Sequence, residues 1–226
     1  MLLVNFPFFW QKLNQKQFKP KQFILKIMIF EQISVGQMQN FSYLIGDEAT
    51  KEAAIVDPGW DIGKLLSAAK KHDLRVKSIL VTHSHYDHIQ QVKDLFDATD
   101  ATVYVHKEDS EEIKNHGVGK IKTVDEGDII NIGKIKIKVL HTPGHTPGSV
   151  CYLIGNKLIT GDTLFVGNIG RTDLPGGSPK IMSETLKRLK KMDENIEVWP
   201  GHDYGSKKHS TIGHEKKYNP HMVMLE

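Results

Sequence analysis

Residues 78–88 read SILVTHSHYDH, and this stretch governs how the rest of the chain is interpreted. The apolar run at 78–82 predicts a buried strand that ends at His83. Three histidines and one aspartate follow within six residues: His83, His85, Asp87 and His88. So dense an H-x-H-x-D-H string at the end of a buried strand indicates a site rather than a polar turn, because a sheet fixes the geometry of the loops at its strand ends.

Three other apolar runs end in the same manner, in a turn containing Gly or Pro that presents one histidine or aspartate. The presented residues are His145 in 141–145 (HTPGH), Asp162 in 158–162 (LITGD) and His202 in 198–202 (VWPGH). Strand ends are where functional side chains are usually mounted. We therefore expect these three residues and the 83–88 cluster to converge on one site.

The ligand types indicate the chemistry of this site. Neutral imidazoles and carboxylates suit zinc, iron or manganese, and the lack of thiolates argues against a closed structural zinc site. Five histidines and two aspartates are too many for one tetrahedral ion, so they suit two ions about 3.5–4 Å apart that share a carboxylate. Such a pair lowers the pKa of a bridging water toward about 7 and polarises a carbonyl group.

The remaining histidines and the cysteine have simpler interpretations. Six histidines outside any ligand-spaced cluster are expected to be ordinary surface or core residues: His72, His106, His116, His209, His214 and His221. His141 lies four residues before His145, but Pro143 and Gly144 exclude a helix between them, so we interpret His141 as a supporting or packing residue. Cys151 lies in an apolar strand, which predicts a buried, inert thiol.

Length and composition indicate one globular domain. The chain has 226 residues, 39% hydrophobic and 25% charged, and no apolar run of about 18–20 residues that would cross a membrane. Residues 1–27 carry five lysines and no acidic residue, so the remainder has a net charge of −2 and offers no basic surface for nucleic acid. Residues 1–27 fit neither a secretory nor a mitochondrial signal. We expect them to be a disordered or non-native extension, with the domain at 28–226 and the enzyme in the cytoplasm.

Periodicity predicts a mixture of strands and helices. The expected strands are 29–35, 41–45, 53–56, 78–82, 102–105, 134–140, 149–154, 157–160 and 197–199. The expected helices are one capped by Asp61, 88–97, 107–114, one starting at Ser178-Pro179, and one after Ser210. Gly155-Asn156 predicts a hairpin turn. This order favours two sheets sandwiched between helices over one doubly wound sheet.

The same motifs resemble the metallo-β-lactamase superfamily, most closely its glyoxalase II-like hydrolases. The resemblance covers residues 28–220 and rests on four segments: THSHYDH at 82–88, HTPGHTPGS at 141–149, GDTLFVGNIGRTDLPGG at 161–177 and PGHDYG at 200–205. It implies an α/β fold of the αββα four-layer type, in which two mixed β-sheets are flanked by helices.

The resemblance also implies roles for individual residues. His83, His85 and His145 would hold a first metal ion. Asp87, His88 and His202 would hold a second, and Asp162 would bridge the two. The implied cofactors are two divalent ions, zinc first, with iron or manganese as alternatives. Asp87 and Asp162 would be the catalytic carboxylates, with Asp87 orienting a metal-bound hydroxide.

The implied activity is hydrolysis of a small-molecule thioester such as S-lactoylglutathione, or of a related ester, by metal-bound hydroxide. The expected substrate is an anionic thiol ester, and no nucleic-acid or membrane partner is expected. Arg171, Asp173 and Tyr204 are the candidate substrate contacts, although Arg171 and Asp173 could instead pair to brace a loop. The sequence does not indicate an oligomeric state.

An alternative relative is the persulfide dioxygenase group, which shares the fold and a Gly-Arg-Thr-Asp segment like 170–173. In that interpretation His83, His145 and Asp162 form a two-histidine, one-carboxylate triad on a single iron, acting on glutathione persulfide. The Leu-Pro-Gly-Gly that follows Asp173 favours the hydrolases. Lactonase or β-lactamase activity, a nuclease and a non-enzymatic metal-binding protein are weaker alternatives.

Overall fold

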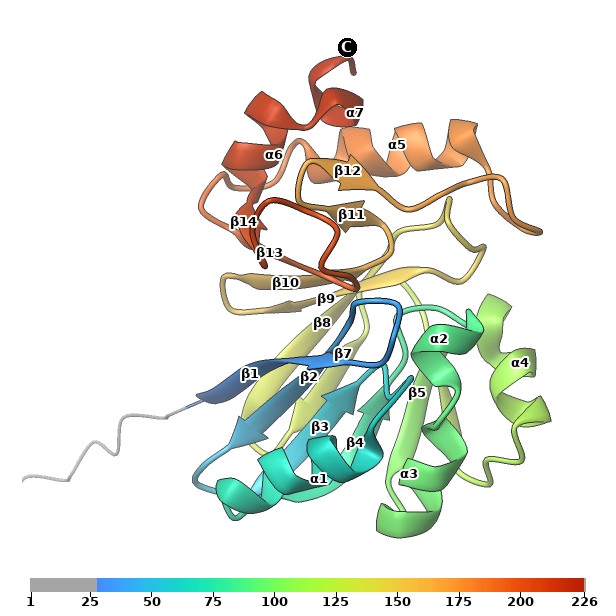
Figure 1. Ribbon diagram of the computed structural model, residues 1–226, viewed down its shortest axis with the longest axis vertical. Helices are drawn as coiled ribbons and strands as arrows, with labels where there is room; N and C mark the ends of the chain where they lie inside the picture. Colours follow the sequence, from blue (N-terminus) through green and yellow to red (C-terminus); the bar gives the residue numbers. More distant parts are fainter. Residues whose placement is uncertain (1–27, 226) are drawn as a thin grey trace, which may run out of the picture.

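Two six-stranded β-sheets pack face to face at the centre of the fold, and the computed structural model describes them within residues 28–225. The predicted N-terminal extension, residues 1–27, lies outside the described residues. Helices cover both outer faces, with α1 and α3 on one side and α5, α6 and α7 on the other (Figure 1). The predicted αββα sandwich is thus confirmed. Among residues 28–225, no helix is both long and apolar enough to cross a membrane.

The first sheet has its strands in sequence order, antiparallel up to the third strand and parallel from there on. They are β1 (Met28–Val35), β2 (Asn40–Asp47), β3 (Glu52–Val56), β4 (Arg75–Leu80), β5 (Thr102–His106) and β6 (Ile121–Val124). The helical segments between them are α1 (Ile62–Lys71), α2 (Tyr86–Ile89), α3 (Val92–Thr99), the 3-10 turn η1 (Lys107–Asp109) and α4 (Ser110–Asn115).

The second sheet has the strand order β14-β13-β10-β9-β8-β7 and contains one parallel pair, β10 with β13. Its strands are β7 (Ile129–Ile132), β8 (Ile135–His141), β9 (Val150–Ile154), β10 (Lys157–Gly161), β13 (Glu197–Pro200) and β14 (Ser210–Thr211). A small hairpin pairs β11 (Leu164–Phe165) with β12 (Asn168–Ile169). The helices are α5 (Pro179–Leu189), α6 (Ile212–Tyr218) and α7 (Pro220–Val223).

Strand alternation divides the core into three layers. In β2, Phe41, Tyr43 and Ile45 face the second sheet, while Leu44 faces the helices of the first. In β8 the side chains alternate between buried and exposed from Ile135 to Val139, as the alternating sequence predicts. Because both faces of β2 are covered, the whole strand is buried, and the two sheets act as one rigid support.

The two sheets are joined by backbone hydrogen bonds at one end. The amide of Phe41 donates to the carbonyl of Gly201 at 2.8 Å, and the amide of Val150 donates to the carbonyl of Thr82 at 2.9 Å. Each of these bonds links a residue of one sheet layer to a residue of the other. The ends of β4, β10 and β13 lie here, so the loops that follow them are held at a fixed separation.

Some local expectations were wrong. The predicted helix 88–97 is two helices, α2 and α3. Asp61 does not cap α1 through its side chain: its φ is 52° and its carboxylate accepts from the amide of Gly36. The side chain of Gln91 instead accepts from the amide of Ile62 at 2.9 Å. This long-range cap joins α1 to the break between α2 and α3.

Helix α5 starts at Ser178-Pro179 as predicted, and the hydroxyl of Ser178 caps it by accepting from the amide of Ile181 at 3.3 Å. We expect Ser178→Ala to lower the free energy of unfolding by about 1 kcal/mol, because the first turn loses that acceptor. Ser67→Ala is the matched control: Ser67 lies inside α1, its hydroxyl bond is exposed, and alanine favours helix. Urea denaturation of both variants measures the effect, and equal stabilities would contradict it.

Candidate metal centre

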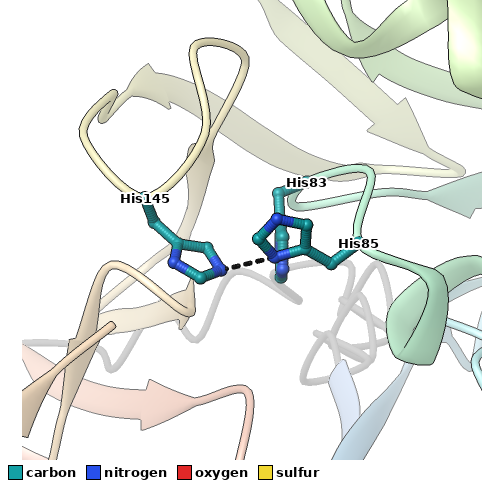
Figure 2. Close-up of side chains that lie close together, drawn as sticks. All are labelled: His83, His85 and His145. Atoms are coloured by element: carbon teal, nitrogen blue, oxygen red, sulfur yellow. Dashed lines mark hydrogen bonds between the residues drawn. The ribbon is translucent and has the colours of Figure 1, made fainter. Parts of the chain in front are cut away.

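The seven residues predicted from the sequence as metal ligands come together where the sheets are joined. The ligand atoms of His83, His85 and His145 all lie within 4.8 Å of one another. The same holds for the ligand atoms of Asp87, His88 and His202. His83, His85, Asp87 and His88 follow β4, His145 is in the β8–β9 loop, Asp162 follows β10 and His202 follows β13. Figure 2 shows His145 reaching across to His83 and His85 from a separate loop.

In the first group, neighbouring residues hold the ring nitrogens that face away from the centre of the group. The other ring nitrogens, called the inner ones, therefore converge. His145 Nδ1 donates to the carbonyl of Arg171 at 2.7 Å, and His83 Nδ1 lies 3.0 Å from the hydroxyl of Thr82. The inner atoms His145 Nε2 and His85 Nδ1 lie 2.8 Å apart (Figure 2). His83 Nε2 is buried and has no hydrogen-bond partner among the described residues.

The second group is arranged in the same way. His88 Nδ1 lies 3.1 Å from a carboxylate oxygen of Asp57, and His202 Nδ1 donates to the carbonyl of Met38 at 2.8 Å. The two Nε2 atoms of these histidines then lie 3.1 Å apart. Asp87 Oδ2 accepts a hydrogen bond from the side-chain amide of Asn40 at 2.9 Å. Fixed outer contacts therefore orient the inner donor atoms of both groups.

Asp162 lies between the two groups. Its Oδ2 is 3.6 Å from His145 Nε2 and 3.3 Å from His202 Nε2, and its Oδ1 is 3.3 Å from His88 Nε2. One carboxylate thus approaches histidines of both groups, as a shared ligand must. Oδ1 is buried without a well-directed hydrogen bond.

The electrostatics of the cluster favour bound positive charge. Burial alone would raise the pKa of Asp87, but hydrogen bonding with His202 and the charge of His88 lower it to about 2. Burial likewise opposes ionisation of Asp162, yet the charge of His88 and the hydrogen bond with His202 keep its pKa well below the usual value. Burial and the neighbouring His88 hold the pKa of His83 well below normal, so this imidazole is neutral.

These residues fit divalent metal ions. Pairs of imidazole nitrogens face each other at close range, a buried nitrogen and a buried carboxylate oxygen are left without directed partners, and the donor set contains only imidazole and carboxylate groups. Facing nitrogen lone pairs need a proton or a cation between them, and imidazole with carboxylate is the ligand chemistry of zinc, iron and manganese.

Asp57 is a supporting residue that the sequence analysis missed. It follows β3 in the segment Val56-Asp57-Pro58 and is buried. Its carboxylate accepts from the amide of Thr82 at 2.7 Å and from the hydroxyl of Thr82 at 2.6 Å, as well as facing His88. A carboxylate at a strand end was the available signal, since Asp162 was recognised by the same feature.

Asp109 is a second missed residue, and it ties together the two loops that carry the first group. Its carboxylate accepts from the amide of Ser84 at 2.8 Å, from the hydroxyl of Thr146 at 2.8 Å and from the amide of Gly148 at 2.8 Å. Asp109 lies in a charged stretch with no site motif, so no sequence signal distinguished it from a surface aspartate.

Cys151, His141 and His106 lie where the sequence indicated. The thiol of Cys151 is buried, as predicted, and burial raises its pKa to about 11, which is the condition for an inert thiol. His141 is a packing residue: its ring stacks on His106 at 4.0 Å and 8°, and its Nε2 donates to the carbonyl of Pro147. Asp125 lies beside this stack, but nearly parallel rings do not direct their lone pairs at one ion. His106 is buried, in agreement with the expectation of an ordinary surface or core residue.

A cavity of about 460 Å³ opens above the cluster. Arg171 and Tyr204, two of the three predicted substrate contacts, line it. Asp173 holds Arg171 through two hydrogen bonds of 2.8 Å, from Nε and from an Nη atom. The Tyr204 ring stacks on His202 at 4.4 Å. Arg171 is therefore both braced by Asp173 and placed at the cavity, so the two alternatives for this pair are compatible.

A four-layer αββα sandwich with a histidine- and aspartate-rich site at one end defines the class of metallo-β-lactamase-like proteins. The family model described as the metallo-beta-lactamase superfamily matches residues 35–202, so the chain belongs to this superfamily. Members of the superfamily are mostly metal-dependent hydrolases.

Two curated relatives carry functional names. The chain is 32% identical over 211 residues to hydroxyacylglutathione hydrolase GloC of Haemophilus influenzae, covering 85% of this chain and 97% of the relative. It is 33% identical over 167 residues to the probable polyketide biosynthesis zinc-dependent hydrolase PksB of Bacillus subtilis, covering 74% of each.

Two solved structures are similar at comparable identity. ETHE1 from Myxococcus xanthus is 34% identical with a TM-score of 0.77, covering 85% of this chain and 84% of that protein. The protein TTHA1623, solved in a di-iron-bound form, is 33% identical with a TM-score of 0.73, covering 84% of this chain and 98% of that protein. Relatives named as hydrolases and a structure named ETHE1 are thus similar to this chain at comparable identity.

We expect Asp162→Ala to remove most of the bound metal and most of the activity, because it deletes the carboxylate that approaches both groups of histidines. Metal content after dialysis, measured by mass spectrometry, tests this, with circular dichroism to verify folding. Asp73→Ala is the matched control, since the Asp73 side chain is 93% exposed. Full metal content in Asp162→Ala would overturn the assignment of this residue.

Asp57→Asn should weaken metal binding by about 10- to 100-fold, because His88 loses the carboxylate that orients its ring. Competition with a chromophoric chelator gives the affinity, and Asp73→Asn serves as the control. Unchanged affinity would mean that Asp57 supports only the Thr82 backbone.

Proposed function

We propose that this chain is a dinuclear-metal hydrolase that cleaves a thioester, of the S-acylglutathione type, or a related ester. One observation carries the proposal: two complete three-residue ligand groups flank Asp162 at the floor of an open cavity. A structural metal site would be closed, whereas this one faces a space that admits a small molecule. The name of the relative GloC supports the thioester as the bond that is cleaved.

The chain's own residues would divide the work as follows. Two divalent ions, when bound, activate water at neutral pH and polarise a carbonyl group. One ion would be held by His83, His85 and His145. The other ion would be held by Asp87, His88 and His202, and Asp162 would hold both ions.

Asp87 would have a further task, since Asn40 holds its Oδ2 in place and the carboxylate would then orient the attacking water. No protein nucleophile is required. A thiolate leaving group with a pKa of about 8.5 departs with little help from a general acid.

The substrate, the cellular compartment and the metal are proposed from the sequence. The substrate is a small anionic thioester that contacts Arg171 and Tyr204 in the cavity, and the enzyme acts in the cytoplasm. Zinc is the proposed metal, which the name of PksB supports, and the di-iron form of TTHA1623 supports iron as the alternative.

A second candidate is an iron-dependent persulfide dioxygenase. The likeness to ETHE1 and the segment Gly170-Arg171-Thr172-Asp173 favour it. It would use His83, His145 and Asp162 on one iron. It leaves Asp87, His88 and His202 without a metal role, although they form an equally complete group, and for that reason we rank it second.

Metal analysis with two assays separates the candidates. The purified protein should bind two metal ions per chain and hydrolyse S-lactoylglutathione, which is followed by the loss of thioester absorbance. It should consume no oxygen with glutathione persulfide. One iron per chain together with persulfide-dependent oxygen uptake would reject the hydrolase proposal in favour of the dioxygenase.

A further inference from the structure

The walls of the cavity above the seven-residue cluster are mostly apolar, with Asn168 and Arg171 as the polar exceptions. Six apolar or aromatic side chains form them: Met38, Tyr86, Phe165, Ile169, Leu174 and Tyr204. They come from the β1–β2 loop, the start of α2, the β11–β12 hairpin and the loops after β12 and β13. Met38, Tyr86 and Tyr204 are exposed although they are apolar or aromatic, and a gathering of such side chains beside a polar cluster marks a ligand site.

Aromatic packing fixes these walls in place. The ring of Tyr204 stacks on His202 and meets the edge of Phe165 at 5.5 Å. Across the cavity, the hydroxyl of Tyr86 donates to the sulfur of Met38 at 3.0 Å. Trp60 packs against the other side of Tyr86 at 6.4 Å. The apolar surface is therefore built before a substrate arrives.

The walls of the cavity carry little charge. Outside the histidines of the cluster, Arg171 is the single cationic side chain among the described residues that line it. Both oxygens of Asp173 accept hydrogen bonds from Arg171 at 2.8 Å, and the Arg171 side chain is 61% exposed, so it is placed to meet the polar thiol half on the solvent side. The walls therefore suit the half of a thioester that carries no charge.

Resting on the proposed thioester hydrolysis, we infer that this cavity binds the acyl half of the substrate and selects thioesters with apolar acyl groups, aliphatic or aromatic, of several carbons. The reacting carbonyl carbon must lie at the floor, beside the cluster. The acyl chain then runs along Phe165, Ile169 and Leu174, and the polar thiol half extends toward solvent. Each methylene group that becomes buried there raises the specificity constant by about fourfold.

A series of S-acylglutathiones tests this inference with the metal-loaded full chain. Acetyl, butanoyl, hexanoyl and phenylacetyl thioesters share one leaving group, and each rate is divided by the rate of hydroxide-catalysed hydrolysis. We expect kcat/KM to rise at least tenfold from acetyl to hexanoyl. A flat or falling series would overturn the inference and leave thioester hydrolysis standing, whereas no hydrolysis of any member would overturn the proposed function.

Binding of unreactive analogues tests the inference whether or not the thioesters are hydrolysed. S-hexylglutathione should bind the metal-loaded protein at least tenfold more tightly than S-methylglutathione in a calorimetric titration. Equal affinities would overturn the inference. A parallel series of acetyl thioesters with lengthening alkyl thiols should show no gain, and a gain confined to that series would assign the walls to the thiol half instead.

A substitution in the wall ties the effect to this cavity. Leu174→Ala should lower the hexanoyl-to-acetyl ratio of kcat/KM about tenfold, because the acyl chain loses an apolar neighbour. Val223→Ala is the matched aliphatic control: Val223 is 51% exposed on α7 and does not line the cavity. An unchanged ratio in Leu174→Ala would place acyl selection elsewhere.

Discussion

The structure depends on gathering seven imidazole and carboxylate groups at one largely buried point. Burying polar and charged groups is costly unless each has a partner, and here the partners are arranged in two layers. The inner atoms face one another, while the outer atoms bond to Thr82, Asp57, Met38 and the Arg171 carbonyl. The backbone bonds that join the two sheets at this end hold both layers in register. The sandwich thus holds at a fixed spacing the four loops that carry the ligands, which follow β4, β8, β10 and β13.

Strand ends explain how much of the site could be predicted. His83, His145, Asp162 and His202 each follow an apolar run and a turn, and such runs are visible in the sequence. Since β10 and β13 are parallel neighbours, their ends necessarily present Asp162 and His202 side by side. The two-sheet order, the β9–β10 hairpin and the cap of α5 were predictable for the same reason, because each rests on local periodicity or on turn chemistry.

What escaped prediction depends on contacts between distant parts of the chain. The short strands β6 and β7 form because β5 and β8 provide neighbours for them, and nothing in their own residues requires a strand. The cap of α1 comes from Gln91, 29 positions away. Asp109 joins two loops that are adjacent only in the folded chain. No periodicity or spacing encodes such partners, so a supporting residue such as Asp109 stays hidden while the ligands stand out.

The supporting residues also explain why the site cannot be separated from the fold. Asp57 accepts two hydrogen bonds from Thr82, and the carbonyl of Thr82 accepts from Val150 in the other sheet. Asp57 therefore links the ring of His88 to the point where the two sheets are joined. A change at Asp57 acts on a ligand and on that joint at once. The cavity walls also touch one ligand, since Tyr204 stacks on His202, Phe165 meets the His202 ring at 5.9 Å, and the carbonyl of Met38 accepts from His202 Nδ1. Ile169 and Leu174 take part in none of these contacts, so the chain can vary its substrate cavity there while the ligand cluster and the sheets remain unchanged.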